Sequence, residues 1–173
     1  MTAMPSSAQP GPAPVATGAA PDDIRAHLRE DHERTLADAD RLRVEQDSDR
    51  SAFLLRQLRR AWVIHALAEE TVIYRALEAV DGRTEPHSDE RFVEHELVEG
   101  LFEKLARLRP GTHEWRARLN VARYLIARHI ENEHCDLFAR LERCFDAEEL
   151  AEMGRRFELA REKLSLLEEA KAA

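Results

Sequence analysis

Residues 65–78 read HALAEETVIYRALE and residues 129–142 read HIENEHCDLFARLE, so the two stretches match without a gap. Both begin with the motif His-x-x-x-Glu and continue with aliphatic and aromatic residues at matching positions. Residues four apart on an α-helix lie on one face, one turn from each other. The repeat therefore predicts two long helices that each carry one histidine and one glutamate on the same face.

A lone histidine that follows an acidic residue precedes each stretch, as Asp31-His32 in the first half and Glu94-His95 in the second. The separation between the lone and the paired histidine is 33 residues in the first half (65 − 32) and 34 in the second (129 − 95). A buried carboxylate or imidazole without a partner is costly, so six such groups facing one core need a shared cation. The candidate metal ligands are His32, His65, Glu69, His95, His129 and Glu133.

Imidazole and carboxylate ligands together suit iron, manganese or zinc. A carboxylate can bridge two metal ions, whereas a histidine binds one. We expect His32 and His65 to bind one ion, His95 and His129 to bind the other, and the two glutamates to bridge them. With a bridging solvent molecule each ion would have about five ligands, which leaves one position open for a small molecule.

Five helices are predicted from apolar residues at helical spacing and from start and stop signals. Asp47 and Thr112 are expected N-caps, and Asp146 begins an expected capping box. The predicted helices span residues 22–46, 49–80, 89–108, 113–143 and 147–171. Because short connections make neighbouring helices antiparallel, the expected fold is all-α: an up-down-up-down four-helix bundle with an additional C-terminal helix.

Three segments are expected along the chain. Residues 1–20 are rich in Pro, Ala, Gly and Ser, and we interpret them as a disordered tail. Residues 21–145 would form the metal-binding bundle, and residues 146–173 the accessory helix. Within the bundle, residues 83–88 are polar, contain Pro86 and are predicted to form a loop.

Composition argues against several functional classes. The 173 residues carry a formal charge of −8, so a basic nucleic-acid-binding surface is not expected. No apolar run approaches the roughly 18 residues of a membrane helix, and the N-terminus lacks the pattern of a secretory signal. Cys135 and Cys144 lie about 13 Å apart along one predicted helix, too far for a disulfide. We therefore expect a cytoplasmic monomer or homodimer that binds neither nucleic acid nor membrane.

The ordered set of six ligands resembles the hemerythrin-like HHE cation-binding family. That family carries a lone His and then His-x-x-x-Glu, twice, on four helices. Here the family's positions are held by His32, His65, Glu69, His95, His129 and Glu133. The resemblance covers about residues 22–160. It implies a non-haem centre of two iron ions, bridged by an oxo or hydroxo group, in a four-helix bundle.

The sequence departs from the oxygen-carrying hemerythrins at two positions. Those carriers have His-x-x-x-His on the third helix, where this chain has Glu99 as the second member. They also have an acid five residues after the last histidine, where this chain has His134. The departures count against stable, reversible oxygen carriage, and they leave Glu99 as either an additional terminal ligand or an acid on the helix face.

Three functions are compatible with these residues. The first is a protein that binds or reacts with a small oxidant (O2, peroxide or NO) as a sensor, scavenger or store. The second is a di-iron enzyme with catalase- or peroxidase-like activity, or with the iron–sulfur repair activity used against nitric oxide stress. The known repair proteins carry an additional N-terminal domain with a cysteine, where this chain has its Pro/Ala-rich tail. The third is a metal-free structural or interaction bundle, which the complete set of six ligands disfavours.

Overall fold

The computed structural model describes residues 22–81 and 86–172, and these contain helices and no strand, which confirms the all-α prediction. The predicted tail, residues 1–20, lies outside the described part. Two segments with π-helical hydrogen bonding interrupt the long helices, and we label them η1 and η2. In chain order the elements are α1 (Ile24–Val44), α2 (Ser48–Glu69), η1 (Glu70–Tyr74), α3 (Arg75–Asp81), α4 (Pro86–Ala106), α5 (His113–Asn132), η2 (Glu133–Leu137), α6 (Phe138–Cys144) and α7 (Ala147–Ala172).

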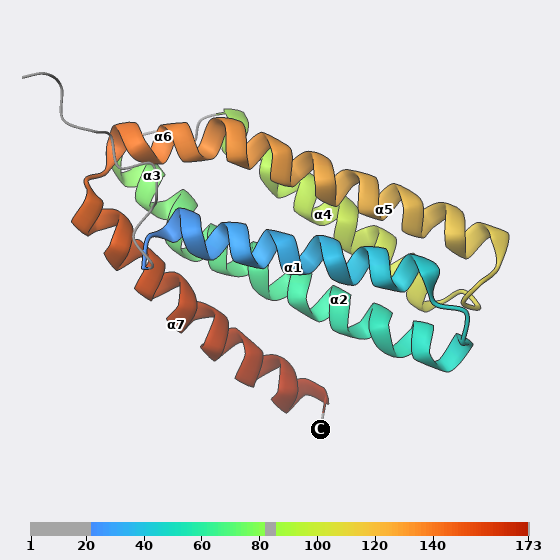
Figure 1. Cartoon of the computed structure of the whole chain (residues 1–173). Helices are drawn as coiled ribbons and strands as arrows, with labels where there is room; N and C mark the ends of the chain where they lie inside the picture. The colour runs from blue at the N-terminus through green and yellow to red at the C-terminus, as the bar shows by residue number, and fades with distance from the viewer. Residues whose placement is uncertain (1–21, 82–85, 173) are drawn as a thin grey trace, which may run out of the picture.

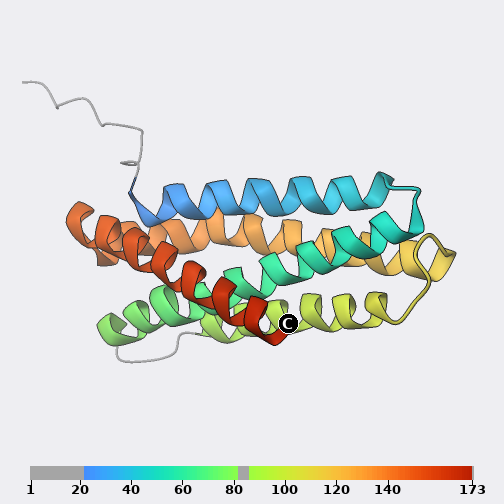
Figure 2. The same ribbon diagram turned by 90° about the horizontal axis from the view of Figure 1, so that it is seen from below.

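Four antiparallel rods form the bundle, as Figures 1 and 2 show. The rods are α1, then α2 continued by η1 and α3, then α4, then α5 continued by η2 and α6. Each rod contacts the next along the chain, and α1 also contacts α5, which closes the ring. Helix α7 crosses this bundle obliquely and packs on α1, α2 and η1. No helix in the described part is long and apolar enough to cross a membrane.

The helices begin where their side chains can satisfy the first free backbone N–H groups. The Asp47 carboxylate accepts the hydrogen bond of the Arg50 N–H at 2.7 Å, and Thr112 Oγ1 accepts that of Trp115 at 3.3 Å. Asp146 and Glu149 accept each other's backbone N–H bonds at 2.9 and 2.8 Å, which is a complete capping box. The predicted starts of α2, α5 and α7 are therefore confirmed.

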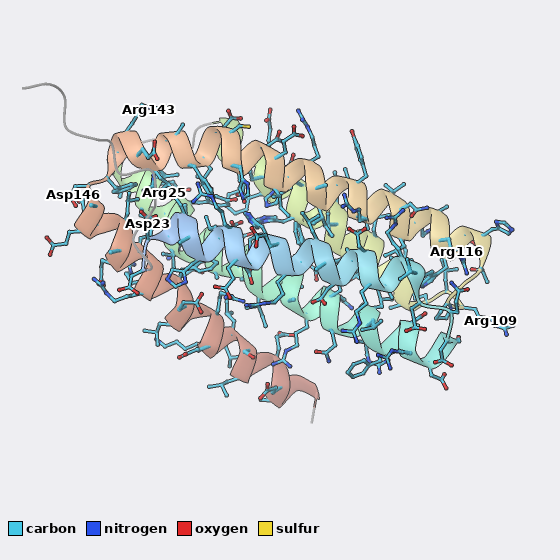
Figure 3. The ribbon with its side chains drawn as sticks, in the orientation of Figure 1. Asp23, Arg25, Arg109, Arg116, Arg143 and Asp146 are labelled. Carbon is cyan, nitrogen blue, oxygen red and sulfur yellow. The ribbon has the colours of Figure 1, made fainter. Side chains whose placement is uncertain are left out.

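The first residues of α1 also connect it to a distant helix. Asp23 caps α1 by accepting the Arg25 N–H at 2.9 Å. The Arg25 guanidinium binds the same carboxylate (Figure 3), and it also pairs with Glu142 on α6. Burial alone would raise the pKa of Asp23, but its hydrogen bonds to Arg25 lower it, so the capping carboxylate stays ionised.

Helix α4 begins earlier than the sequence indicated. Residues 86–88 were expected in a loop because of Pro86, but the structure begins α4 at that proline. Proline is compatible with the first turn of a helix, because the backbone N–H that it lacks would have no partner within the helix. Pro86 therefore marks the start of α4 and not a break between helices.

The interior consists of two apolar clusters with a polar layer between them. One cluster lies toward the α1–α2 and α4–α5 connections and includes Leu42, Trp62, Phe102, Trp115 and Leu119. The other lies toward α7 and includes Leu28, Ile73, Leu77, Leu141 and Phe157. All six candidate metal ligands are buried and lie where their helices pass from one cluster to the other. The fold therefore places a charged layer in the middle of a hydrophobic core.

The π-helical segments lie next to the two glutamates of the repeat. Segment η1 begins directly after Glu69, and η2 begins at Glu133 itself. A residue five positions after Glu69 on a regular α-helix would point about 140° away from it. The wider π-helical turn corrects this rotation, and Tyr74, five residues after Glu69, reaches its carboxylate. The two long helices therefore lie where the sequence predicted them, but a π-helical segment interrupts each one.

Helix α7 approaches the start of α1 most closely at a glycine. A Cβ atom added to Gly154 would lie 2.0 Å from the Asp22 carbonyl oxygen and 2.9 Å from His27 Cδ2. A backbone carbonyl yields less readily than the end of a flexible side chain. We expect Gly154→Ala to lower the free energy of unfolding by about 1–3 kcal/mol, although alanine favours helices. Urea unfolding followed by circular dichroism measures this change.

Gly100 on α4 is the matched control, because no atom lies within 4 Å of a Cβ built there. Gly100→Ala is expected to raise the free energy of unfolding by about 0.5–1 kcal/mol through helix propensity alone. If Gly154→Ala raised stability as much as Gly100→Ala, the close packing of α7 on α1 would be refuted.

Candidate metal centre

The six predicted side chains converge in the polar layer. Five of them offer ligand atoms that all lie within 4.8 Å of one another: His32, His65, Glu69, His129 and Glu133. The sixth, His95, directs its Nε2 to within 3.3 Å of His129 Nε2 and 3.4 Å of Glu69 Oε2. Four helical rods thus each deliver donor atoms to one small region.

The histidines form two pairs, and the glutamates lie between the pairs. The closest ring centroids are those of His32 and His65, 5.0 Å apart, and of His95 and His129, 4.7 Å apart. Glu69 Oε2 lies 3.4 Å from Nε2 of both His65 and His95, one histidine from each pair. Glu133 Oε2 lies 3.2 Å from His32 Nε2 and 3.3 Å from His129 Nε2. Each carboxylate therefore has the position expected of a bridge.

The acid before each lone histidine orients the paired histidine of the next rod. Asp31 Oδ2 lies 3.0 Å from His65 Nδ1, and Glu94 Oε2 lies 2.9 Å from His129 Nδ1. A carboxylate on Nδ1 selects the tautomer that leaves the other ring nitrogen free to bind a metal. These two contacts explain why both halves of the chain contain an acid followed by a histidine.

The residue after each of the two cluster glutamates completes this outer layer. Glu70 Oε1 lies 3.4 Å from His95 Nδ1, and His134 Nε2 lies 3.0 Å from His32 Nδ1. All four histidines therefore have an outer partner on Nδ1 and present Nε2 to the cluster. This arrangement is typical of metal-binding histidines in proteins.

Two aromatic side chains enclose the cluster. The Tyr74 hydroxyl lies 3.1 Å from Glu133 Oε1 and 3.3 Å from Glu69 Oε2, so it can donate to either carboxylate. Burial raises the pKa of Tyr74 well above its usual value, and the charges of the two glutamates raise it further, so its proton stays on the oxygen. On the opposite side the Trp62 ring lies 5.4–5.6 Å from the rings of His65, His95 and His129. Both aromatic residues are fully buried and keep bulk water away.

Glu99 lies apart from the six. Its carboxylate is 44% exposed and lies 3.5 Å from the Arg59 guanidinium. It does not belong to the group of described residues whose ligand atoms converge. The structure thus favours the interpretation of Glu99 as an acid on the helix face.

The cluster holds opposite charges at close range. Burial alone would lower the pKa of His129, but the nearby charge of Glu133 and the hydrogen bond to Glu94 raise it to about 10. Burial likewise opposes ionisation of Glu133, but the charge of His129 holds the pKa of this carboxyl well below its usual value. A buried carboxylate is stabilised here by a cation, which can be either a proton on histidine or a metal ion.

Several buried atoms of the cluster fit a metal better than a hydrogen bond. His32 Nε2, His65 Nε2, Glu69 Oε1 and Glu133 Oε2 are buried and have no hydrogen-bond partner with suitable geometry. Buried polar atoms are satisfied in most folded proteins. Nitrogen and oxygen donors that converge on a shared space, with their outer atoms already bonded, therefore match the requirements of metal ions.

Metal binding at this cluster should release protons. The raised pKa of His129, about 10, means that this residue holds a proton at neutral pH unless a metal replaces it. Below that pKa the proton competes with the metal, so affinity should rise with pH, by about tenfold per pH unit for each proton displaced. Anaerobic titration with ferrous iron at pH 6 and pH 8, with a pH indicator, measures both effects. Equal affinity at both pH values without proton release would contradict this expectation.

Sequence reasoning identified the six cluster residues but missed part of their surroundings. The contact of Glu70 with His95 was not predicted, although Glu70 and His134 occupy the same position of the repeat. The Tyr74 hydroxyl reaches the glutamates only because of η1. The alignment of residues 65–78 with residues 129–142 was the signal that could have identified Glu70 and His134. The sequence pattern contained no signal for η1.

The bundle and its centre define a class: all-helical proteins with a buried histidine–glutamate cluster suited to metal ions. The family model of the hemerythrin HHE cation binding domain matches residues 23–141. The chain therefore belongs to that family, as the sequence resemblance predicted. All of α7 lies beyond the matched residues. A search of curated proteins and a search of solved structures each found no match.

Proposed function

We propose that this protein binds two iron ions in the buried cluster and that the iron pair binds or reacts with a small oxidant: O2, peroxide or NO. The protein would act as a sensor, scavenger or store of that oxidant in the cytoplasm. The observation that carries the proposal is the convergence of four histidine Nε2 atoms on two shared carboxylates. Iron bound there would supply a change of oxidation state and a position for a small ligand.

Each cluster residue has a proposed role. His32 and His65 would bind one ion, and His95 and His129 the other. Glu69 and Glu133 would bridge, because each lies between one histidine of each pair. Asp31 and Glu94 hold His65 and His129 in the correct orientation.

The surrounding residues restrict what reaches the ions. The six cluster residues are at most 4% exposed, and Trp62 and Tyr74, which pack against them, are about 1% exposed. The Tyr74 hydroxyl holds a proton between the two carboxylates. A dry, preorganised site of this kind favours a small neutral ligand over a large or highly charged one.

Anaerobic loading with ferrous iron, followed by separate additions of O2, hydrogen peroxide and NO, tests the proposal. At least one of the three should change the near-ultraviolet and visible absorbance, with saturation near one ligand per iron pair. The Glu131→Gln variant is the control, because Glu131 is exposed and lies on the same rod as His129 and Glu133. It should behave as wild type. No absorbance change with any of the three would refute the proposal.

The second candidate is an enzyme that decomposes peroxide. The position of the Tyr74 hydroxyl favours it, because a buried proton donor lies beside the carboxylates. Repeated turnover of peroxide by wild type, lost in Glu69→Ala, would support catalysis. Oxidation of the iron that stops after one equivalent of peroxide would favour the role of sensor, scavenger or store.

A further inference from the structure

The two histidine pairs of the cluster differ in the charges behind them. The inner layer is nearly symmetric, with two histidines per pair and two shared glutamates. The outer layer is symmetric only in part: Asp31 behind His65 matches Glu94 behind His129, at 3.0 and 2.9 Å. The remaining outer partners of the two pairs are chemically different.

The difference lies at one position of the repeat. Glu70 and His134 each directly follow a bridging glutamate, in the matching stretches 65–78 and 129–142. Glu70 places a carboxylate 3.4 Å from His95 Nδ1, whereas His134 places an imidazole nitrogen 3.0 Å from His32 Nδ1. One pair therefore has two carboxylates behind it, and the other has one carboxylate and one imidazole.

A contact from α7 enlarges the difference. The free oxygen of Asp31, Oδ1, accepts a hydrogen bond from Arg161 Nη2 at 2.6 Å. The corresponding oxygen of Glu94 accepts a bond from the neutral Asn132 amide at 3.2 Å. Arg91 lies 3.7 Å from Glu133, which both pairs share, and its charge also acts on Glu94. The arginine from α7 makes its hydrogen bond to the carboxylate behind His65.

Outer carboxylates strengthen the histidines that they touch. A carboxylate that accepts the Nδ1–H bond increases the electron density on Nε2 and makes it a better ligand. A neutral imidazole does this less. Loss of such an outer partner typically weakens metal binding about 10–100-fold. The pair with two carboxylates also provides more negative charge for a divalent cation.

We propose that the two metal positions are unequal: the position at His95 and His129 binds a divalent ion first and more tightly, and the position at His32 and His65 binds second and more weakly. Glu70 and His134 act as positioning residues that set this order. The inference rests on the proposed function only in assuming that both positions bind metal. It assigns a role to the position of the repeat at which one half has Glu70 and the other has His134.

Titration of the metal-free protein with Co2+, followed by visible absorbance, tests the order without any assay of activity. Wild type should show two steps whose dissociation constants differ by about tenfold or more. His95→Ala should remove the tighter step, and His32→Ala the weaker one. Loss of the tighter step in His32→Ala would overturn the assignment.

Exchanging the two outer residues tests the cause. His134→Glu should tighten the second step about tenfold, so that the two steps merge. Glu70→Gln, which keeps the side-chain shape, should weaken the first step about tenfold or more. His113→Glu changes the net charge equally at an exposed position on α5, about 24 Å from His129 along the helix, and should leave both steps unchanged.

The outcomes separate the two proposals. Two equal steps in wild type, or steps that respond neither to His134→Glu nor to Glu70→Gln, would overturn the inference and leave the metal centre intact. Absence of any Co2+ binding to wild type would overturn both. Two unequal steps that merge in His134→Glu would establish the role of the outer layer.

Discussion

Replacing His129 with alanine should reduce the bound iron from about two ions per chain to one or none. His129 lies 3.3 Å from Glu133, 3.9 Å from Glu69 and 3.3 Å from His95. It is therefore next to both glutamates and to the other histidine of its pair. Its removal takes a nitrogen ligand from one ion. It also leaves the buried Glu133 carboxylate without its main source of positive charge.

The measurement is elemental analysis after anaerobic iron loading and desalting, with circular dichroism to confirm that the variant remains helical. His113→Ala is the control, because it removes an exposed histidine from the same helix and should retain the full iron content. Iron content in His129→Ala equal to that of wild type would exclude this residue as a ligand.

Iron loading should raise the melting temperature by about 8–16 °C. A ligand present at about 1,000 times its dissociation constant adds about 4 kcal/mol to the free energy of unfolding, and each kcal/mol shifts the melting temperature of a chain of this size by about 2–4 °C. The physical reason is that metal ions satisfy buried atoms, among them His32 Nε2 and Glu133 Oε2, that have no hydrogen-bond partner.

Thermal unfolding with and without a chelator measures this shift. In His129→Ala the shift should fall to a few degrees or vanish, which ties the stabilisation to the cluster and not to general binding of iron. An unchanged melting temperature on loading wild type would instead support a structural bundle that does not use metal.

The cluster of six side chains could be predicted because helix periodicity converts sequence spacing into spatial position. His65 and Glu69 are one helical turn apart, and the repeat supplies the same pair again. The caps at Asp47 and Thr112 were also readable, because a cap depends on residues within one turn. Predictions of this kind, which depend only on residues close together in the sequence, agree with the structure.

Features that depend on distant contacts could not be predicted in the same way. The hydrogen bond of Arg161 to Asp31 joins α7 to α1 across 130 residues of sequence, and no periodic pattern marks it. The need for a glycine at position 154 arises from the carbonyl of Asp22 and the ring of His27, both far away in the sequence. The π-helical turn that directs Tyr74 to the glutamates departs from the regular geometry on which sequence patterns rest.

The most direct test of the account is the metal content of the wild-type protein made in iron-supplemented medium and purified without an affinity tag. About two iron ions per chain would agree with a centre of four histidines and two bridging glutamates. A content near zero for every metal would contradict the central claim, and two zinc ions would contradict the proposed reaction with an oxidant.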